Sequence, residues 1–156
     1  MFIEIVIISH ISKKQQPFNF LIMKGFKIAI EQSTLENNNF RKVLYTSSHS
    51  QLVLMSLKPN EEIGEEIHPE NDQFFRFESG RGKCTIDGNE YTVSEGDAVL
   101  IPAGSKHNVK NTDGERELKM YTLYSPAHHK DGIIRKTKAD AEAKENQEVF
   151  EGITTE

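Results

Sequence analysis

The sequence has a single cysteine and no dense basic stretch. The first feature bears on the cellular compartment and the second on the kind of partner. Cys84 cannot form a disulfide within the chain, so nothing requires an oxidising compartment and we expect a cytoplasmic location. Lys and Arg total 19 against 24 for Asp and Glu, which gives a net charge of -5. Since no basic run can follow a phosphate backbone, we expect no nucleic-acid partner.

Long hydrophobic runs are missing as well. Residues 1–22 are apolar in composition, because 12 of them are Met, Phe, Ile, Val or Leu. The stretch is nevertheless interrupted well before the roughly 20 consecutive apolar residues that span a bilayer. It also lacks the basic start and the small-residue cleavage site of a signal peptide. We therefore expect no membrane association and interpret residues 1–22 as an N-terminal extension or an extra strand.

The rest of the 156-residue chain has the length of one domain and the pattern of an all-β fold. Apolar residues alternate with polar ones or form short runs, and turn sequences rich in Gly, Pro, Asn and Asp separate them. Nine short strands at such spacing predict a sandwich or a barrel. The predicted strands are residues 26–30, 43–46, 51–57, 73–77, 83–86, 90–93, 98–101, 107–110 and 118–124.

The pattern changes near the C-terminus. From residue 136 the chain is rich in helix-forming residues but has no apolar stripe, which predicts a short surface helix or a frayed tail. We therefore divide the chain into the extension at residues 1–22, a barrel over residues 23–126 and a C-terminal tail over residues 127–156.

One segment carries most of the chemical information. Residues 96–111 run from a short apolar strand through a Pro/Gly turn into a return strand, and His107 begins that return strand. This segment resembles the second conserved motif of the cupin superfamily. The matching residues, spacing included, are Gly96, Pro102, Gly104, His107 and Asn111.

An upstream segment resembles the first cupin motif in altered form. That motif usually has two histidines separated by one residue, then a glutamate, then six residues and a glycine. We interpret His68 as the first histidine, Glu70 as standing in for the second and Gln73 as standing in for the glutamate. Six residues then remain before Gly80, but the spacer from Gly64 to His68 is three residues where the family usually has five.

These two motifs predict a metal site formed by His68, Glu70, Gln73 and His107. Residues two apart on a strand face the same side, so His68 and Glu70 would project together into a barrel interior. Two imidazoles, one carboxylate and one amide oxygen suit a divalent Zn, Mn, Fe, Co or Ni ion. Open coordination positions would remain for water or substrate.

Other candidate residues lie outside the expected ligand set. His128 and His129 follow the last strand, where such a pair is usually exposed, although the tail could also cover the barrel mouth. Phe75 and Phe77 lie two and four residues after Gln73 on the same predicted strand, so all three side chains face the same side. The two aromatic residues therefore line the cavity or, more commonly, form core. No residue is identified as catalytic.

The resemblance implies an all-β double-stranded β-helix, the jelly-roll barrel of cupins, and a homodimer. Cupins include isomerases, epimerases, dioxygenases, decarboxylases and non-catalytic sugar binders, so the fold does not decide the function. We expect a metal-dependent protein that acts on a small polar molecule. A sugar or sugar-phosphate isomerase is the leading interpretation, because the chain resembles small cupins labelled mannose-6-phosphate isomerase-like. An iron-dependent dioxygenase and a non-catalytic carbohydrate or small-molecule-binding module remain alternatives.

Overall fold

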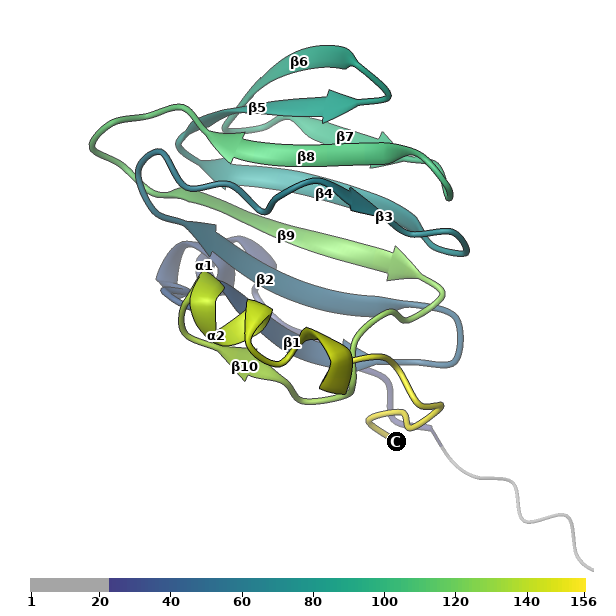
Figure 1. Ribbon diagram of the computed structural model, residues 1–156. Helices are drawn as coiled ribbons and strands as arrows, with labels where there is room; N and C mark the ends of the chain where they lie inside the picture. The colour runs from purple at the N-terminus through teal and green to yellow at the C-terminus, as the bar shows by residue number, and fades with distance from the viewer. Residues whose placement is uncertain (1–22) are drawn as a thin grey trace, which may run out of the picture.

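A computed structural model describes residues 23–156, which form two facing antiparallel β-sheets (Figure 1). The strands are β1 (Arg41–Thr46), β2 (Gln51–Leu57), β3 (Glu66–Ile67), β4 (Asp72–Ser79), β5 (Arg81–Ile86), β6 (Asn89–Ser94), β7 (Ala98–Ile101), β8 (Lys106–Asn111), β9 (Leu118–Ser125) and β10 (Ile134–Arg135). One sheet has the order β10-β1-β2-β9-β4-β7 and the other β3-β8-β5-β6. The predicted all-β double-stranded β-helix is confirmed. Residues 1–22, interpreted as an extension, lie outside the described residues.

The first predicted strand is wrong, whereas the other eight are present. Residues 26–29 have no regular structure, and α1 (Ile30–Glu36) follows them. Within this helix the Thr34 hydroxyl donates to the Ile30 carbonyl at 2.8 Å, and the Gln32 amide donates to Glu36 at 2.9 Å. Three alternating apolar residues are a weak strand signal, and these contacts one turn apart favour the helix instead.

The helices of the described part of the chain are short. Besides α1 they are α2 (Lys138–Glu142) and the 3₁₀ helix η1 (Glu145–Gln147). The predicted C-terminal helix is therefore confirmed as α2, which begins with a reciprocal capping box between Thr137 and Asp140. No helix in residues 23–156 is long and apolar enough to cross a membrane.

The tail after β9 folds back onto the barrel. Strand β10 pairs with β1, where Arg135 lies opposite Arg41, and α2 lies beside these two strands (Figure 1). Ala141 of α2 is 4% exposed and belongs to the main core cluster. The C-terminal tail is therefore packed against the six-stranded sheet.

Apolar side chains fill one end of the space between the sheets. Phe75 and Phe77, for which the sequence predicts either core or cavity lining, are fully buried core residues. Burying a side chain of this size stabilises the fold by about 1.5–3 kcal/mol. Other members of the same core cluster are Val53, Met55, Leu57, Cys84, Val93, Val109, Leu118 and Met120.

Toward the other end the inward positions become polar. On β4 the inward side chain before Phe75 is Gln73, and on β9 the inward positions after Met120 are Thr122 and Tyr124. On β8 the inward side chain before Val109 is His107. The alternation of the strands thus directs buried polar groups to one end of the barrel, where the candidate ligands lie.

The connection between β4 and β5 depends on Gly80. Its φ is 90°, in the left-handed region that side chains rarely adopt. A Cβ at this position would lie 2.5 Å from the Glu117 carbonyl oxygen and 2.9 Å from the Leu118 Cα. Only glycine fits here without moving the start of β9.

We predict that Gly80→Ala lowers the free energy of unfolding by at least about 2 kcal/mol, because backbone strain adds to the clash with the chain at Glu117. The control is Gly114→Ala, since a Cβ there meets nothing within 4 Å and its φ lies outside the left-handed region. Urea denaturation of both variants measures the difference. Equal stability of the two variants would contradict the prediction.

Candidate metal centre

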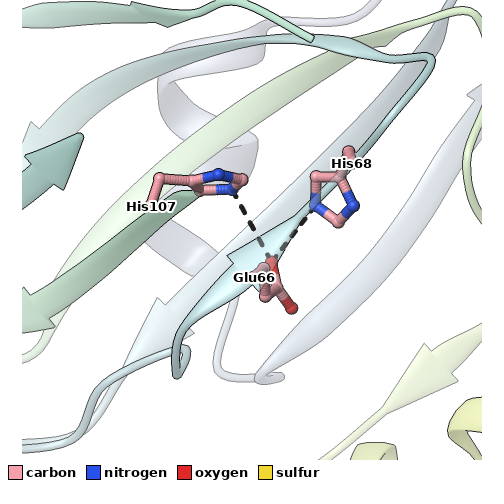
Figure 2. Close-up of side chains that lie close together, drawn as sticks. All are labelled: Glu66, His68 and His107. Carbon is pink, nitrogen blue, oxygen red and sulfur yellow. Dashed lines mark ion pairs between the residues drawn. The ribbon is translucent and has the colours of Figure 1, made fainter. Parts of the chain in front are cut away.

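Three potential metal ligands, Glu66, His68 and His107, come together between the sheets (Figure 2). One ligand atom from each lies within 4.8 Å of the others. Strand β3 pairs with β8 so that Glu66 stands opposite His107. His68 follows β3 directly and is two residues from Glu66, so both side chains face the same side.

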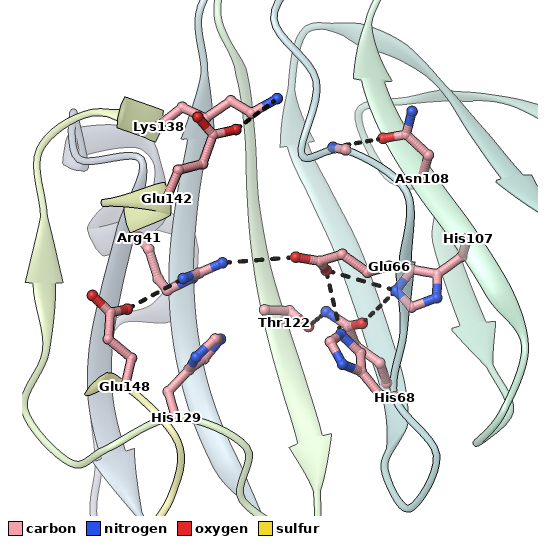
Figure 3. Close-up of polar contacts among 12 residues, drawn as sticks. Arg41, Glu66, His68, His107, Asn108, Thr122, His129, Lys138, Glu142 and Glu148 are labelled. Atoms are coloured by element: carbon pink, nitrogen blue, oxygen red, sulfur yellow. Dashed lines mark hydrogen bonds and ion pairs between the residues drawn. The ribbon is translucent and has the colours of Figure 1, made fainter. Parts of the chain in front are cut away.

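The carboxylate of Glu66 divides its two oxygens between different partners (Figure 3). Its Oε2 lies 3.3 Å from Nε2 of His68 and 3.9 Å from Nε2 of His107. Its Oε1 lies 3.9 Å from Nη2 of Arg41. One oxygen is therefore directed at the imidazoles and the other at a guanidinium.

Gln73 reaches the same cluster from the facing sheet. Its Oε1 lies 3.1 Å from Nε2 of His107, and its amide nitrogen donates to the Thr122 hydroxyl at 3.2 Å. Gln73 is 1% exposed. The structure thus brings together three of the four residues predicted from the sequence, His68, Gln73 and His107.

The hydrogen bonding of His107 defines its tautomer. Nδ1 lies 3.0 Å from the Ser105 carbonyl oxygen, which can only accept, so Nδ1 carries the proton and donates. Burial lowers the pKa of His107 below its ordinary value and favours the neutral ring. The lone pair of a neutral ring then lies on Nε2, which faces Gln73 and Glu66.

The charge state of Glu66 follows from its neighbours. Burial alone would raise the pKa of Glu66, but the contact with His68 and the guanidinium of Arg41 outweigh it and hold the pKa below its usual range. At neutral pH the cluster therefore contains a carboxylate rather than a carboxylic acid.

These residues fit a divalent transition metal. Nε2 of His68 is buried and, apart from its 3.3 Å contact with Oε2 of Glu66, has no hydrogen-bond partner in residues 23–156. It converges with Nε2 of His107, Oε2 of Glu66 and Oε1 of Gln73, so four electron-pair donors point into one region. A buried acceptor without a hydrogen-bond partner lowers the stability of the fold by about 1–3 kcal/mol, and one bound cation can be the partner of several such acceptors. Imidazole nitrogens and carboxylate or amide oxygens are ligands for such a cation.

The structure does not bring Glu70 to this cluster. Glu70 is exposed and lies in the turn between β3 and β4. The alternation that we expected to align it with His68 requires a continuous strand, but β3 ends at Ile67. Glu66, on the other side of His68, stands in the cluster instead.

The spacing of the sequence also contains a signal for Glu66. If Glu66 and His68 take the two histidine positions of the first cupin motif, Asn60 takes the position of the preceding glycine. Five residues then separate Asn60 from Glu66, as in the usual spacer. Asn60 has a φ of 63°, a conformation that glycine and asparagine adopt more readily than other residues.

The two tail histidines lie beside the cluster. The ring of His128 is 4.1 Å from that of His68 and stacks on Tyr124 at 5.2 Å, measured between centroids. His129 is 6% exposed, and its Nε2 lies 3.3 Å from the Tyr124 hydroxyl. Burial lowers the pKa of His128 to about 4, so this ring is neutral at pH 7. The pair therefore lies against the barrel mouth, and His129 is buried there.

A pocket of about 340 Å³ opens beside Glu66 and His68. The barrel contributes Arg41 to its wall, and the tail contributes His128 and Glu148. Such a volume is at the lower end of the range for small-molecule sites. The candidate metal centre is thus accessible from a polar pocket that the tail helps to form.

Residues 53–124 match the family model described as a cupin domain. The chain is 43% identical to the uncharacterized protein YrkC of Bacillus subtilis over 129 residues, which cover 79% of this chain and 69% of that protein. It is 45% identical over 112 residues to the uncharacterized protein L612 of Acanthamoeba polyphaga mimivirus, with 70% of each chain covered.

Solved structures agree with this relationship. The crystal structure of BH2720 from Bacillus halodurans superposes with a TM-score of 0.74 at 44% identity, covering 76% of this chain and 93% of that one. The cupin domain of Schizosaccharomyces pombe Cnp3 shares the fold with a TM-score of 0.53 at 14% identity, covering 56% of this chain and 64% of that one. From the two-sheet barrel, the motif that places His107 and the matching family model, we conclude that the chain belongs to the cupin superfamily.

Proposed function

We propose that this protein binds a divalent transition metal through Glu66, His68 and His107, with Gln73 as a fourth donor, and acts on a small polar molecule. The observation that carries the proposal is the convergence of buried nitrogen and oxygen acceptors on one region. A metal bound there would act as a Lewis acid on carbonyl or hydroxyl oxygens of the substrate.

The charges around the pocket favour a neutral, hydroxyl-bearing substrate. Arg41 is already paired with Glu66 and Glu148. Two glutamates that line the pocket hold further basic groups, since Glu148 is paired with Arg135 and Glu65 with Lys106 at 2.8 Å. A phosphate ester is usually bound by Arg or Lys side chains that are free to contact it. A sugar isomerase with an unphosphorylated substrate is therefore our leading assignment within the mannose-6-phosphate isomerase-like interpretation.

His128 is the tail residue that we assign to contact with this substrate. Its ring lines the pocket next to His68 and makes no hydrogen bond within residues 23–156. Only its backbone does, since the amide donates to Gln51 and the carbonyl accepts from Phe150. A neutral imidazole offers one donor and one acceptor, which matches a hydroxyl group.

An iron-dependent dioxygenase is the second candidate, and the composition of the cluster favours it. Two histidines and one carboxylate with open positions are the ligand set of many non-haem iron oxygenases. Elemental analysis of protein purified without added metal separates the two assignments. Zinc or manganese supports the isomerase, whereas iron together with oxygen uptake supports the dioxygenase.

We predict that Glu66→Gln reduces metal affinity at least about tenfold, because it removes the carboxylate from the cluster. The matched control is Glu70→Gln, which changes an exposed residue outside the cluster and should leave affinity unchanged. Competition with a chromophoric chelator measures both affinities. Normal binding by the Glu66 variant, or equal loss in both variants, would place the metal elsewhere.

We predict that His128→Ala retains the metal but weakens binding of unphosphorylated mannose, the probe, at least about fivefold through the lost hydrogen bonds. The control is His49→Ala, which removes an exposed histidine distant in sequence from both motifs. Calorimetric titration of the metal-loaded proteins measures the affinities. Tighter binding of mannose 6-phosphate than of mannose to the wild-type protein would contradict the substrate assignment.

A further inference from the structure

A pair of buried charges connects the C-terminal tail to the metal centre (Figure 3). Glu148 follows η1 and is 3% exposed, although it carries a carboxylate. Its Oε2 lies 3.4 Å from Nη1 of Arg41, and its Oε1 pairs with Nε of Arg135. Arg41 is itself 7% exposed and belongs to β1. The tail thus places a negative charge against a buried guanidinium of the barrel.

The other side of this guanidinium faces the candidate metal ligands. Nη2 of Arg41 lies 3.9 Å from Oε1 of Glu66, while Oε2 of Glu66 faces His68 and His107. The terminal torsion of a glutamate is broad, so an unsupported carboxylate could turn either oxygen, or neither, toward the imidazoles. Arg41 attracts one oxygen and leaves the other for the cluster.

Further contacts tie the segment of Glu148 to residues 128–130 of the same tail, and tie residues 128–130 to the barrel. The Lys130 amide donates to the Glu148 carbonyl at 2.7 Å, and the Phe150 amide donates to the His128 carbonyl at 2.9 Å. Gln51, fully buried on β2, accepts from the His129 amide at 2.9 Å. If the tail moved away, Arg41 would lose its partner Glu148. Its buried charge would then be balanced only by Glu66, 3.9 Å away.

We propose that Arg41 and Glu148 are positioning residues of the metal centre, so that docking of the C-terminal tail and metal binding strengthen each other. This inference rests on the proposed metal site. Residues that orient a ligand without touching the metal commonly raise metal affinity. Because the coupling of two equilibria is reciprocal, a metal that binds more tightly when the tail is docked must also stabilise the docked tail.

The first test compares two glutamates of the same tail. Glu148→Gln removes the charge that holds Arg41, whereas Glu151→Gln removes a charge from an exposed pair with Lys130. With Zn²⁺ as the probe and a competing chelator, the Glu148 variant should bind about 10- to 100-fold more weakly than wild type. The Glu151 variant should differ from wild type by less than about twofold.

The second test measures how the tail responds to metal, first in the wild-type protein and then in the variants. Hydrogen exchange of residues 127–149 should become slower when Zn²⁺ is added, and the same addition should slow exchange less in the Glu148→Gln variant. A purely structural role of Glu148 would lower the stability of the variant without changing either response to metal. Arg41→Lys should behave like Glu148→Gln, because an ammonium group cannot bridge two carboxylates as a guanidinium does.

The outcomes separate this inference from the proposed function. If wild-type protein binds no Zn²⁺, the metal site fails and the coupling fails with it. If wild type binds Zn²⁺ but the Glu148 and Glu151 variants have equal affinity, the positioning role is overturned and the metal site stands. If the Glu148 variant does not fold, unchanged exchange in wild-type protein on adding Zn²⁺ overturns the coupling.

Discussion

The half-buried carboxylate of Glu66 is the charge on which the organisation of this site depends. A carboxylate partly removed from water needs compensation, and the guanidinium of Arg41 supplies it on the side of Oε1, while Oε2 faces the imidazoles of His68 and His107. That guanidinium is itself buried, and it is balanced in turn by Glu148 of the C-terminal tail. The charge of Glu66 is therefore linked through Arg41 to Glu148, which lies more than eighty residues later in the chain.

The core residues and the candidate metal ligands lie at opposite ends of the barrel. Phe75, Phe77 and Met120 belong to the apolar end, which supplies the core, whereas Gln73 and Tyr124 continue the same strands into the polar end. A rigid apolar support limits the movement of the polar side chains next to it, since protein cores are closely packed. The strands can thus hold several acceptors close together, although these groups repel each other and would move apart in a loosely packed structure.

The fold was largely predictable because strands and turns leave local signals. Eight strands followed from alternation and turn residues, and the segment containing His107 also predicted its position at the start of a strand. The N-terminal prediction failed because alternation over residues 26–30 is too short to outweigh the helical contacts of α1. The two-residue strands β3 and β10 carry almost no local pattern, since pairing with β8 and β1 defines them.

By itself, the sequence determined the fold class, the turn that presents His107, and His68 and Gln73 as members of the cluster. The tertiary structure placed Glu66 rather than Glu70 in the cluster. The two glutamates flank His68 at equal spacing, and beyond the spacer from Asn60 the sequence does not show that β3 ends at Ile67, before Glu70. The tertiary structure also decided the contribution of the tail. The proximity of Glu148 to Arg41 and of His128 to His68 comes from contacts between distant segments, for which no local periodicity exists.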